Sequence, residues 1–281
     1  MTAQTAVLPK EPRGSRLPLT LIVGSGIVLA WCILAATAPW VTPYEPTAID
    51  ILHALEAPSS QFWFGTDQVG RDVLSRTLFS ARIDLLMCAL GVLPAMLIGT
   101  TIGVVSGYYG GWFDTVLMRV YDITVAFPFF VLILAIVGAL GPGLANYFIA
   151  LALVGWVSYA RLVRAEVLVI KNADYIHAAR VLGFKDRAIL TRHILPNAIY
   201  PVIAYAMTDA VLVILAGASL GFLGMGAQPP TAEWGVMIAE GQTFVDRAWW
   251  ICFFPGLATI SLGLGLVLLG DGLAQWRRRA P

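Results

Sequence analysis

The chain has 281 residues, of which 58% are hydrophobic and 12% are charged, and its formal net charge is +1. Ordinary soluble domains carry roughly 25% charged residues, so this composition excludes a soluble protein and indicates a membrane protein. A net charge this close to zero gives no sign of a nucleic-acid partner, and none is expected.

Six apolar stretches are long enough to cross a bilayer, which takes about 20 mostly apolar residues in a helix. They lie at residues 19–39, 84–107, 116–140, 145–165, 198–224 and 251–275. The sequence therefore predicts an all-α integral membrane protein with six transmembrane helices. An even number of spans places both termini on the same side of the membrane.

The Lys and Arg residues beside the spans indicate the orientation. With the N-terminus inside, thirteen of them flank cytoplasmic span ends and four lie outside. The inside set is Lys10, Arg13, Arg16, Arg161, Arg164, Lys171, Arg180, Lys185, Arg187, Arg192 and Arg277–Arg279. The outside set is Arg71, Arg76, Arg82 and Arg247. We therefore expect both termini in the cytoplasm.

Residues 1–16 are expected to form a polar cytoplasmic tail, and residues 17–39 the first transmembrane helix. A cleaved secretory signal is the alternative, because a basic stretch, an apolar stretch and Ala36-Thr37-Ala38 resemble its three zones. The apolar stretch is longer than the usual span of about 7–15 residues, and Pro39 directly follows the would-be cleavage site. Retention as a membrane anchor is therefore favoured.

Residues 40–82 form the longest external segment. Its aromatic cluster Phe62–Phe64 suits the level of the lipid headgroups. A helix is expected to begin after Gly70, where Asp72 and Arg76 lie one turn apart, acid first, and are predicted to pair. The simpler interpretation is an interfacial helix leading into the second span. The alternative is a platform that touches a delivered substrate or its carrier.

Several spans carry glycines at helix-packing spacing. Gly99, Gly103 and Gly107 recur every four residues, as do Gly217 and Gly221, while Gly263 and Gly265 lie close together. Small residues four apart let helix backbones approach closely in lipid. Close helix packing is the favoured explanation for these glycines. The alternative is that they line a substrate path.

Charged residues within spans also need a partner. Asp209 lies near the middle of the fifth span, where an acidic residue costs about 2.5–3.5 kcal/mol. It should therefore face the bundle or a wet cavity, either in a structural hydrogen bond or in the translocation path. Arg119 and Asp122 are one turn apart in the third span and are expected to pair.

The segment 166–197, between the fourth and fifth spans, is expected to be a cytoplasmic loop. Asn172 and Asp174 are both good helix N-caps. Gly183 fits the left-handed conformation that ends a helix. The sequence therefore predicts a short helix over about 174–182.

A second helix is predicted from Lys185 to Ile194, ending before Pro196 because the residue preceding a proline avoids the α region. On the first helix, residues three and four apart share a face. That face carries Ile176, Ala179, Arg180 and Gly183. The small Ala178-Ala179 pair would let another protein approach closely. An amphipathic helix resting on the membrane is the alternative.

The loop resembles a known family. Ala178-Ala179-x-x-x-Gly183, followed by Ile194-Leu195-Pro196, resembles the EAA loop of importer permeases in the ATP-binding-cassette superfamily. An external motif narrows the resemblance to the C-type permease of the dipeptide, oligopeptide and nickel transporters. That motif consists of Phe64, Gly65, Thr66, Asp67, Gly70, Arg71, Asp72, Ser75 and Arg76.

Further matches to this family lie at Gly107–Trp112 with Asp114, at Phe222–Gly224 and at Pro230–Gly235. Together the motifs cover most of the chain from residue 40 onward, and in this order and spacing they are highly specific. Two positions depart from the family pattern. His177 stands where the motif usually has glutamate, and Gly217 stands where relatives often carry an acidic residue.

The resemblance implies the type I importer permease fold, with a five-helix core over 83–275 and a basic cytoplasmic tail over 276–281. It implies the bacterial inner membrane, a B-type permease as heterodimer partner, two cytoplasmic ATPases, and a periplasmic or lipid-anchored substrate-binding protein. It also assigns ATPase coupling to loop residues, namely Asp174, Ile176, His177, Ala178, Ala179, Arg180, Gly183, Phe184, Leu195 and Pro196.

The chain itself offers no nucleotide site. A phosphate-binding loop requires Gly-Lys followed by Ser or Thr. The lysines here stand instead in Pro9-Lys10, Ile170-Lys171 and Phe184-Lys185. We therefore expect no catalytic residue, cofactor or metal in this chain, and ATP and Mg²⁺ would be bound by the partner ATPases.

The function that the resemblance implies is import of peptides or a related small solute. Nickel complexes, glutathione, opines and sugar conjugates are the alternatives within the family. A secondary transporter or channel that acts alone is a more remote alternative.

Overall fold

The computed structural model describes residues 17–228 and 230–279, so the expected tail 1–16 lies outside the described residues. Within that part of the chain all regular structure is helical, apart from one β-bridge between Thr66 and Asp72. Five helices are long and apolar enough to cross a membrane, and a bent helix pair adds a sixth crossing if it counts as one span. The predicted all-α membrane class is confirmed.

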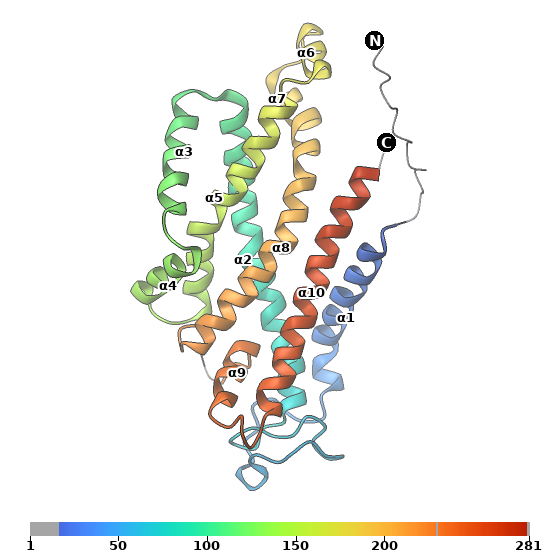
Figure 1. Ribbon diagram of the computed structural model, residues 1–281, viewed down its shortest axis with the longest axis vertical. Coiled ribbons are helices and arrows are strands. Elements are labelled where there is room, and N and C mark those ends of the chain that lie inside the picture. Colours follow the sequence, from blue (N-terminus) through green and yellow to red (C-terminus); the bar gives the residue numbers. More distant parts are fainter. Residues whose placement is uncertain (1–16, 229, 280–281) are drawn as a thin grey trace, which may run out of the picture.

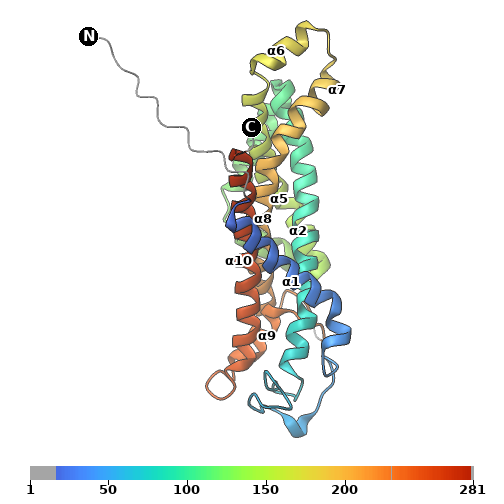
Figure 2. The same cartoon turned by 90° about the vertical axis from the view of Figure 1, so that its right-hand side faces the viewer.

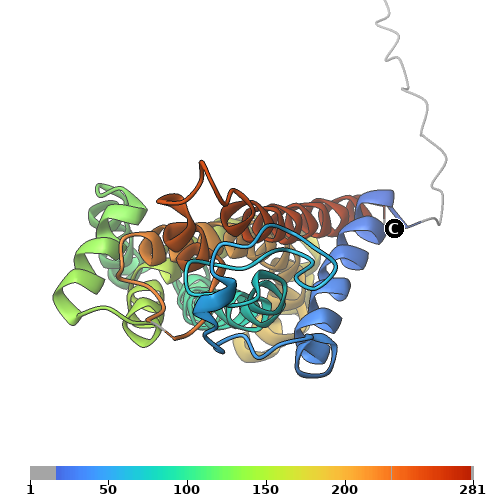
Figure 3. The same cartoon turned by 90° about the horizontal axis from the view of Figure 1, so that it is seen from below.

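Long helices form the bundle: α1 (Leu19–Val41), α2 (Val73–Tyr109), α5 (Leu144–Ile170), α8 (Leu195–Phe222) and α10 (Trp250–Arg279). In Figure 1, α2, α5, α8 and α10 lie together and α1 packs along α10. Helices α3 (Gly111–Val125) and α4 (Phe129–Leu140) lie on the side of the bundle away from α1, as Figures 1 and 3 show.

Helix α2 is longer than a membrane span. Its 37 residues extend about 55 Å, against a hydrocarbon core of about 30 Å. Asp72 caps its N-terminus by accepting a hydrogen bond of 2.7 Å from the Ser75 N–H. Residues 73–82, expected to form an interfacial helix leading into the second span, are the first turns of α2 itself. The predicted Asp72–Arg76 pair is wrong, because Asp72 caps the helix.

The packing of α2 against α5 depends on glycine. A Cβ atom at Gly103 would lie 2.5 Å from the Ala160 carbonyl oxygen, and one at Gly99 would lie 2.3 Å from the Trp156 carbonyl oxygen. Such distances are possible only without a side chain, so the two backbones approach closely. The packing explanation for the glycines of the second span is confirmed.

The third predicted span is wrong as a single helix. The structure divides 116–140 into α3 and α4, which are bent by 87° relative to each other. Pro128 precedes α4 as its N-cap residue and has no N–H for a continuing helix. The preceding residue is also pushed away from helical geometry, so the break falls at this proline.

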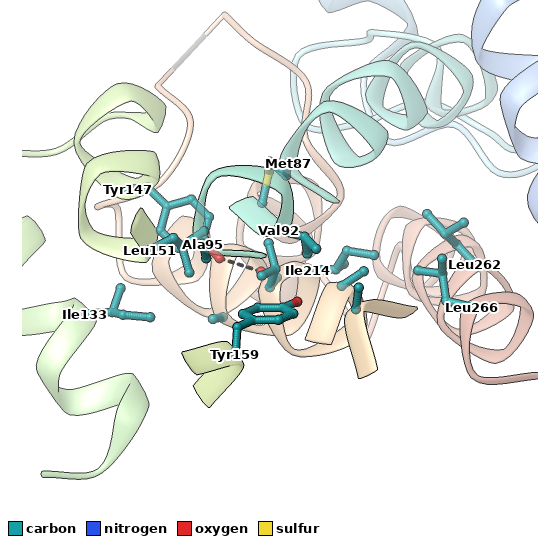
Figure 4. Close-up of a cluster of buried hydrophobic side chains, with 14 of the residues drawn as sticks. Met87, Val92, Ala95, Ile133, Tyr147, Leu151, Tyr159, Ile214, Leu262 and Leu266 are labelled. Carbon is teal, nitrogen blue, oxygen red and sulfur yellow. Dashed lines mark hydrogen bonds between the residues drawn. The ribbon is translucent and has the colours of Figure 1, made fainter. Parts of the chain in front are cut away.

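Large apolar side chains fill the centre of the bundle, as Figure 4 shows for Met87 and Val92 of α2, Leu151 of α5 and Ile214 of α8. Tyr147 is also fully buried, and its hydroxyl donates a hydrogen bond of 2.5 Å to the Val213 carbonyl oxygen. The buried hydroxyl of Tyr147 therefore has a hydrogen-bond partner.

Two groups of short elements occupy opposite ends of the bundle. Helices α6 (Asp174–Val181) and α7 (Asp186–Ile189) project from one end, the end toward which α1 begins and α10 finishes (Figures 1 and 2). At the other end lie α9 (Trp234–Gln242) and the segment 42–72 with the short helix η1 (Ile51–His53), which crosses the end of α2 in Figure 3.

The aromatic cluster in segment 42–72 differs from expectation. Phe62 is buried, and Phe64 stacks on Phe254 of α10 with ring centroids 3.7 Å apart. These two rings therefore pack inside the protein, and their predicted headgroup contact is wrong. Trp63, between them in sequence, is exposed.

Candidate functional site

The α6–α7 hairpin (residues 174–189) ends its first helix with a defined turn. Gly183 has a φ of +82°, as the left-handed stop requires. Its N–H donates to the Arg180 carbonyl oxygen, and the Phe184 N–H donates to the Ala179 carbonyl oxygen. This pair of bonds is a Schellman motif, which fixes the direction of the chain after α6.

The start of α6 is not capped as predicted. Ala173 is the N-cap residue, and its side chain makes no capping bond. The Asn172 side chain instead donates to the Leu168 carbonyl oxygen at the end of α5. Asp174 lies in the first turn of α6, where its charge favours the helix dipole. The N-cap prediction is therefore wrong for both residues.

The face of α6 that the helical spacing predicted is only partly exposed, at Arg180 and Gly183. Ile176 and Ala179 are buried against the rest of the protein, so only Ala178 of the alanine pair is exposed. Val181 is 88% exposed and Leu182 is 76% exposed at the tip. The tip also exposes Tyr175, His177, Arg180 and Phe184.

The predicted second helix does not stop before Pro196. Residues 186–222 run on as one helix, with a π-helical segment η2 (Leu190–Ile194) ahead of the proline. The Leu195 N–H donates to the Leu190 carbonyl oxygen, five residues back, so the wide turn makes room for the proline ring. The Asn197 side chain satisfies the His193 carbonyl oxygen at 2.7 Å.

Leu195 and Pro196 lie away from the hairpin tip. They line a cavity of about 530 Å³ between α8 and α2, together with Met96, Leu97, Thr100, Thr101, Val104, Val105 and Ile199. The structure therefore separates the predicted coupling residues into a projecting hairpin and a pair at the start of α8.

At the opposite end of the bundle, eight of the nine residues of the external family motif are buried, and Phe64 is half-buried. The buried ones are Gly65, Thr66, Asp67, Gly70, Arg71, Asp72, Ser75 and Arg76. The Thr66 carbonyl oxygen accepts a hydrogen bond of 3.0 Å from the Trp250 indole. The Ser75 hydroxyl oxygen accepts one from the Tyr44 N–H. The motif is thus an internal scaffold that joins segment 42–72 to α2 and α10.

Four charges in this scaffold form a charge cluster, which consists of Asp67, Arg71, Arg76 and Glu240. The Asp67 carboxyl oxygen Oδ2 accepts from Arg71 Nε at 2.6 Å and from Arg76 Nη1 at 2.5 Å. Glu240 Oε2 accepts from both guanidinium groups at 2.9 Å. Two cations and two anions therefore balance, and they join α9 to the start of α2.

A second contact between α2 and the start of α9 involves the acidic residues Asp84 and Glu233, and it was not predicted. Glu233 caps α9, accepting hydrogen bonds from the Gly235 and Val236 N–H groups, and burial raises its pKa. The fully buried carboxyl of Asp84 accepts a hydrogen bond of 3.4 Å from the Trp234 N–H. These residues are about 150 positions apart in sequence, so no local pattern could have indicated the contact.

The structure also shows the partners of the charged residues in the spans. Arg119 and Asp122 pair at 3.8 Å on the exposed face of α3, as predicted. Asp209 is buried in α8 and accepts a hydrogen bond of 2.8 Å from the Tyr159 hydroxyl. The structural hydrogen bond expected for Asp209 is therefore present, and its place in the translocation path stays a prediction.

Comparison with known proteins identifies the family. The family model described as binding-protein-dependent transport system inner membrane component matches residues 99–279. A dipeptide transport system permease protein of Alkalihalophilus pseudofirmus is 40% identical over 252 residues, covering 90% of this chain and 83% of the relative.

Two further relatives are comparably similar. A probable D,D-dipeptide transport system permease protein of Escherichia coli is 40% identical, covering 93% of this chain and 87% of the relative. A glutathione transport system permease protein of Pectobacterium atrosepticum is 41% identical, covering 89% and 84%. The chain belongs to the family of inner membrane components of binding-protein-dependent transport systems. It is a multi-pass membrane permease subunit, not an enzyme.

Proposed function

We propose that this chain is the C-type permease subunit of an ATP-driven importer for peptides or glutathione, and that a cytoplasmic ATPase holds it by the α6–α7 hairpin. A B-type permease, a second ATPase and an external binding protein complete the proposed assembly. ATP and Mg²⁺ would be bound by the ATPases, because the lysines of this chain lack the phosphate-loop context.

The exposed apolar tip of the hairpin carries this proposal. Val181 and Leu182 are largely exposed on the hairpin, at the end of the bundle where α1 begins and α10 finishes. The excess of Lys and Arg beside the span ends supports a cytoplasmic position for that end. Apolar side chains that extend into water beyond the membrane indicate a protein partner.

The attachment of the hairpin also suits it to transmit displacement from an ATPase to the bundle. Moving a two-state gate from 1:99 to 99:1 takes about 5.5 kcal/mol of differential free energy. Ile176 and Ile189 anchor the hairpin in the core, and the Schellman motif at Gly183 fixes its turn. A hairpin fixed in this way can pass displacement to the bundle.

The test is Leu182→Asp in the complete transporter, because a charge buried without a partner at an interface costs about 3–5 kcal/mol. We expect loss of the ATPases from the purified complex, and loss of uptake. Leu52→Asp is the matched control, since Leu52 is 91% exposed at the opposite end of the molecule. Retention of the ATPases and of uptake by Leu182→Asp would contradict the proposal.

Gly183→Pro provides a second variant, because proline removes the N–H that closes the turn and cannot adopt positive φ. We expect loss of substrate-stimulated ATP hydrolysis with normal membrane insertion. Ala179→Arg is a poorer probe, because Ala179 is buried and a large charge there would disturb the hairpin itself.

The substrate class rests on the dipeptide, D,D-dipeptide and glutathione relatives. Uptake of labelled alanylalanine, labelled glutathione and labelled nickel, each measured separately, tests it. We expect uptake of alanylalanine or of glutathione. Uptake of nickel alone would contradict the proposed substrate class.

A further inference from the structure

Tyr108, the penultimate residue of α2, contacts both helices of the α6–α7 hairpin. Its hydroxyl donates a hydrogen bond of 2.6 Å to the Asp186 carboxyl oxygen at the start of α7. The guanidinium carbon of Arg180 in α6 lies 5.7 Å from the centre of its ring, within cation–π range. One side chain of the bundle therefore contacts α6 on its ring and α7 on its hydroxyl.

The end of α2 that carries Tyr108 is firmly attached to α5. The Lys171 ammonium donates a hydrogen bond of 2.7 Å to the Gly107 carbonyl oxygen. A Cβ atom at Gly107 would lie 2.9 Å from Cβ of Val167, so the two helices touch there. Tyr108 is consequently part of the bundle and does not belong to the mobile surface of a loop.

Further contacts of the hairpin with the rest of the protein are apolar, or aromatic where Tyr175 and Phe184 lie beside the His193 ring. Ile176 and Ile189 are buried in the core, where packing has no strong directional preference. Among the described residues, Tyr108 is the only residue outside 171–197 to which a side chain of 174–189 forms a hydrogen bond. A hydrogen bond to a carboxylate is short and directional, so it resists sliding of the hairpin across α2.

We infer that Tyr108 is a positioning residue that passes displacement of the α6–α7 hairpin to α2. The inference rests on the proposed function, in which an ATPase moves the hairpin. Helix α2 runs without a break from Tyr108 to the charge cluster at the opposite end of the bundle. A push at Tyr108 would therefore be carried along the full length of α2.

The test is Tyr108→Phe in the complete transporter, with the binding protein carrying alanylalanine. Phenylalanine keeps the ring and removes only the hydroxyl. We expect the ATPases to remain bound and basal ATP hydrolysis to stay unchanged. Stimulation of hydrolysis by the loaded binding protein should fall by about tenfold, since a hydrogen bond to a charged group contributes that much.

Tyr109→Phe is the matched control. It removes the same hydroxyl group one residue away, from a side chain that is 60% exposed. Stimulation should be unchanged in this variant. A second pair of variants tests the acceptor. Asp186→Asn retains an oxygen that can accept from Tyr108 and should keep most of the stimulation, whereas Asp186→Ala should lose it.

The double variant Tyr108→Phe with Asp186→Ala should be no worse than either single variant, because both remove the same bond. Equal stimulation in Tyr108→Phe and Tyr109→Phe, or fully additive losses in the double variant, would overturn the inference. Neither result would touch the proposed function, which fails separately if Leu182→Asp keeps its ATPases.

Discussion

The Tyr159 hydroxyl and the Asp209 carboxyl group, on α5 and α8, meet at 2.8 Å inside the bundle. Each would otherwise be a buried polar group with no access to water, and the bond removes that cost for both. An acidic residue in the middle of a span is thus explained by a partner on a neighbouring helix.

Tyr159→Phe should destabilise the protein by about 1–3 kcal/mol, because it leaves the Asp209 carboxyl without its donor. Asp209→Asn should cost less, since the amide oxygen can still accept from Tyr159. Thermal unfolding of the purified protein measures both, and Tyr109→Phe is the hydroxyl-deletion control. A stable Asp209→Asn variant that has lost uptake would instead place Asp209 in the translocation path.

The charge cluster should be sensitive to loss of one member. Arg76 is almost fully buried, so Arg76→Met leaves Asp67 with one cation fewer and should cost about 3–5 kcal/mol. Arg82→Met, on the same helix at an exposed position, should change stability by less than about 0.5 kcal/mol. Equal unfolding temperatures for the two variants would show that the cluster contributes little.

The glycine contact between α2 and α5 should not tolerate even a methyl group. Gly103→Ala should destabilise by about 1–3 kcal/mol, because its Cβ would meet the Ala160 carbonyl oxygen and Val163. Gly26→Ala is the control, since a Cβ there meets nothing within 4 Å. Denaturation of both variants in the same detergent gives the comparison, and an unaffected Gly103→Ala would contradict the close packing.

The stability of the turn at η1 should depend on pH. The hydrogen bond that the His53 ring donates to the Asp50 carboxylate raises the pKa of His53 above its usual value of about 6.5. A raised folded pKa means that the stabilisation is complete below about pH 6.5 and is lost as pH rises through the folded pKa. NMR titration of His53 should give a lower pKa in Asp50→Asn than in the native chain. An identical titration in both would rule out the pairing.

The sequence was sufficient for features that depend on local chemistry. Long apolar stretches located the membrane helices, and Gly183 indicated its own left-handed conformation and the end of α6. Family motifs, which record the fold indirectly, pointed to the hairpin and to the buried scaffold around Asp67.

Features that depend on distant contacts could not be predicted. Arg76 binds Glu240, which lies 164 positions away, and nothing near Arg76 could favour that partner over Asp72. The orientation of α6 depends on what lies beneath Ile176, so helical spacing alone could not predict that Ile176 and Ala179 are buried. The helix stop expected before Pro196 is wrong because residue propensities do not predict the π-helical turn that precedes it.

The central claim is that this subunit is a passive gate, which ATPases move through the α6–α7 hairpin. The most direct test is uptake of labelled alanylalanine into proteoliposomes that contain both permease subunits, with binding protein and ATP present. Uptake should occur when the ATPases are included and should be absent when they are omitted. Uptake at the same rate without the ATPases would contradict the account.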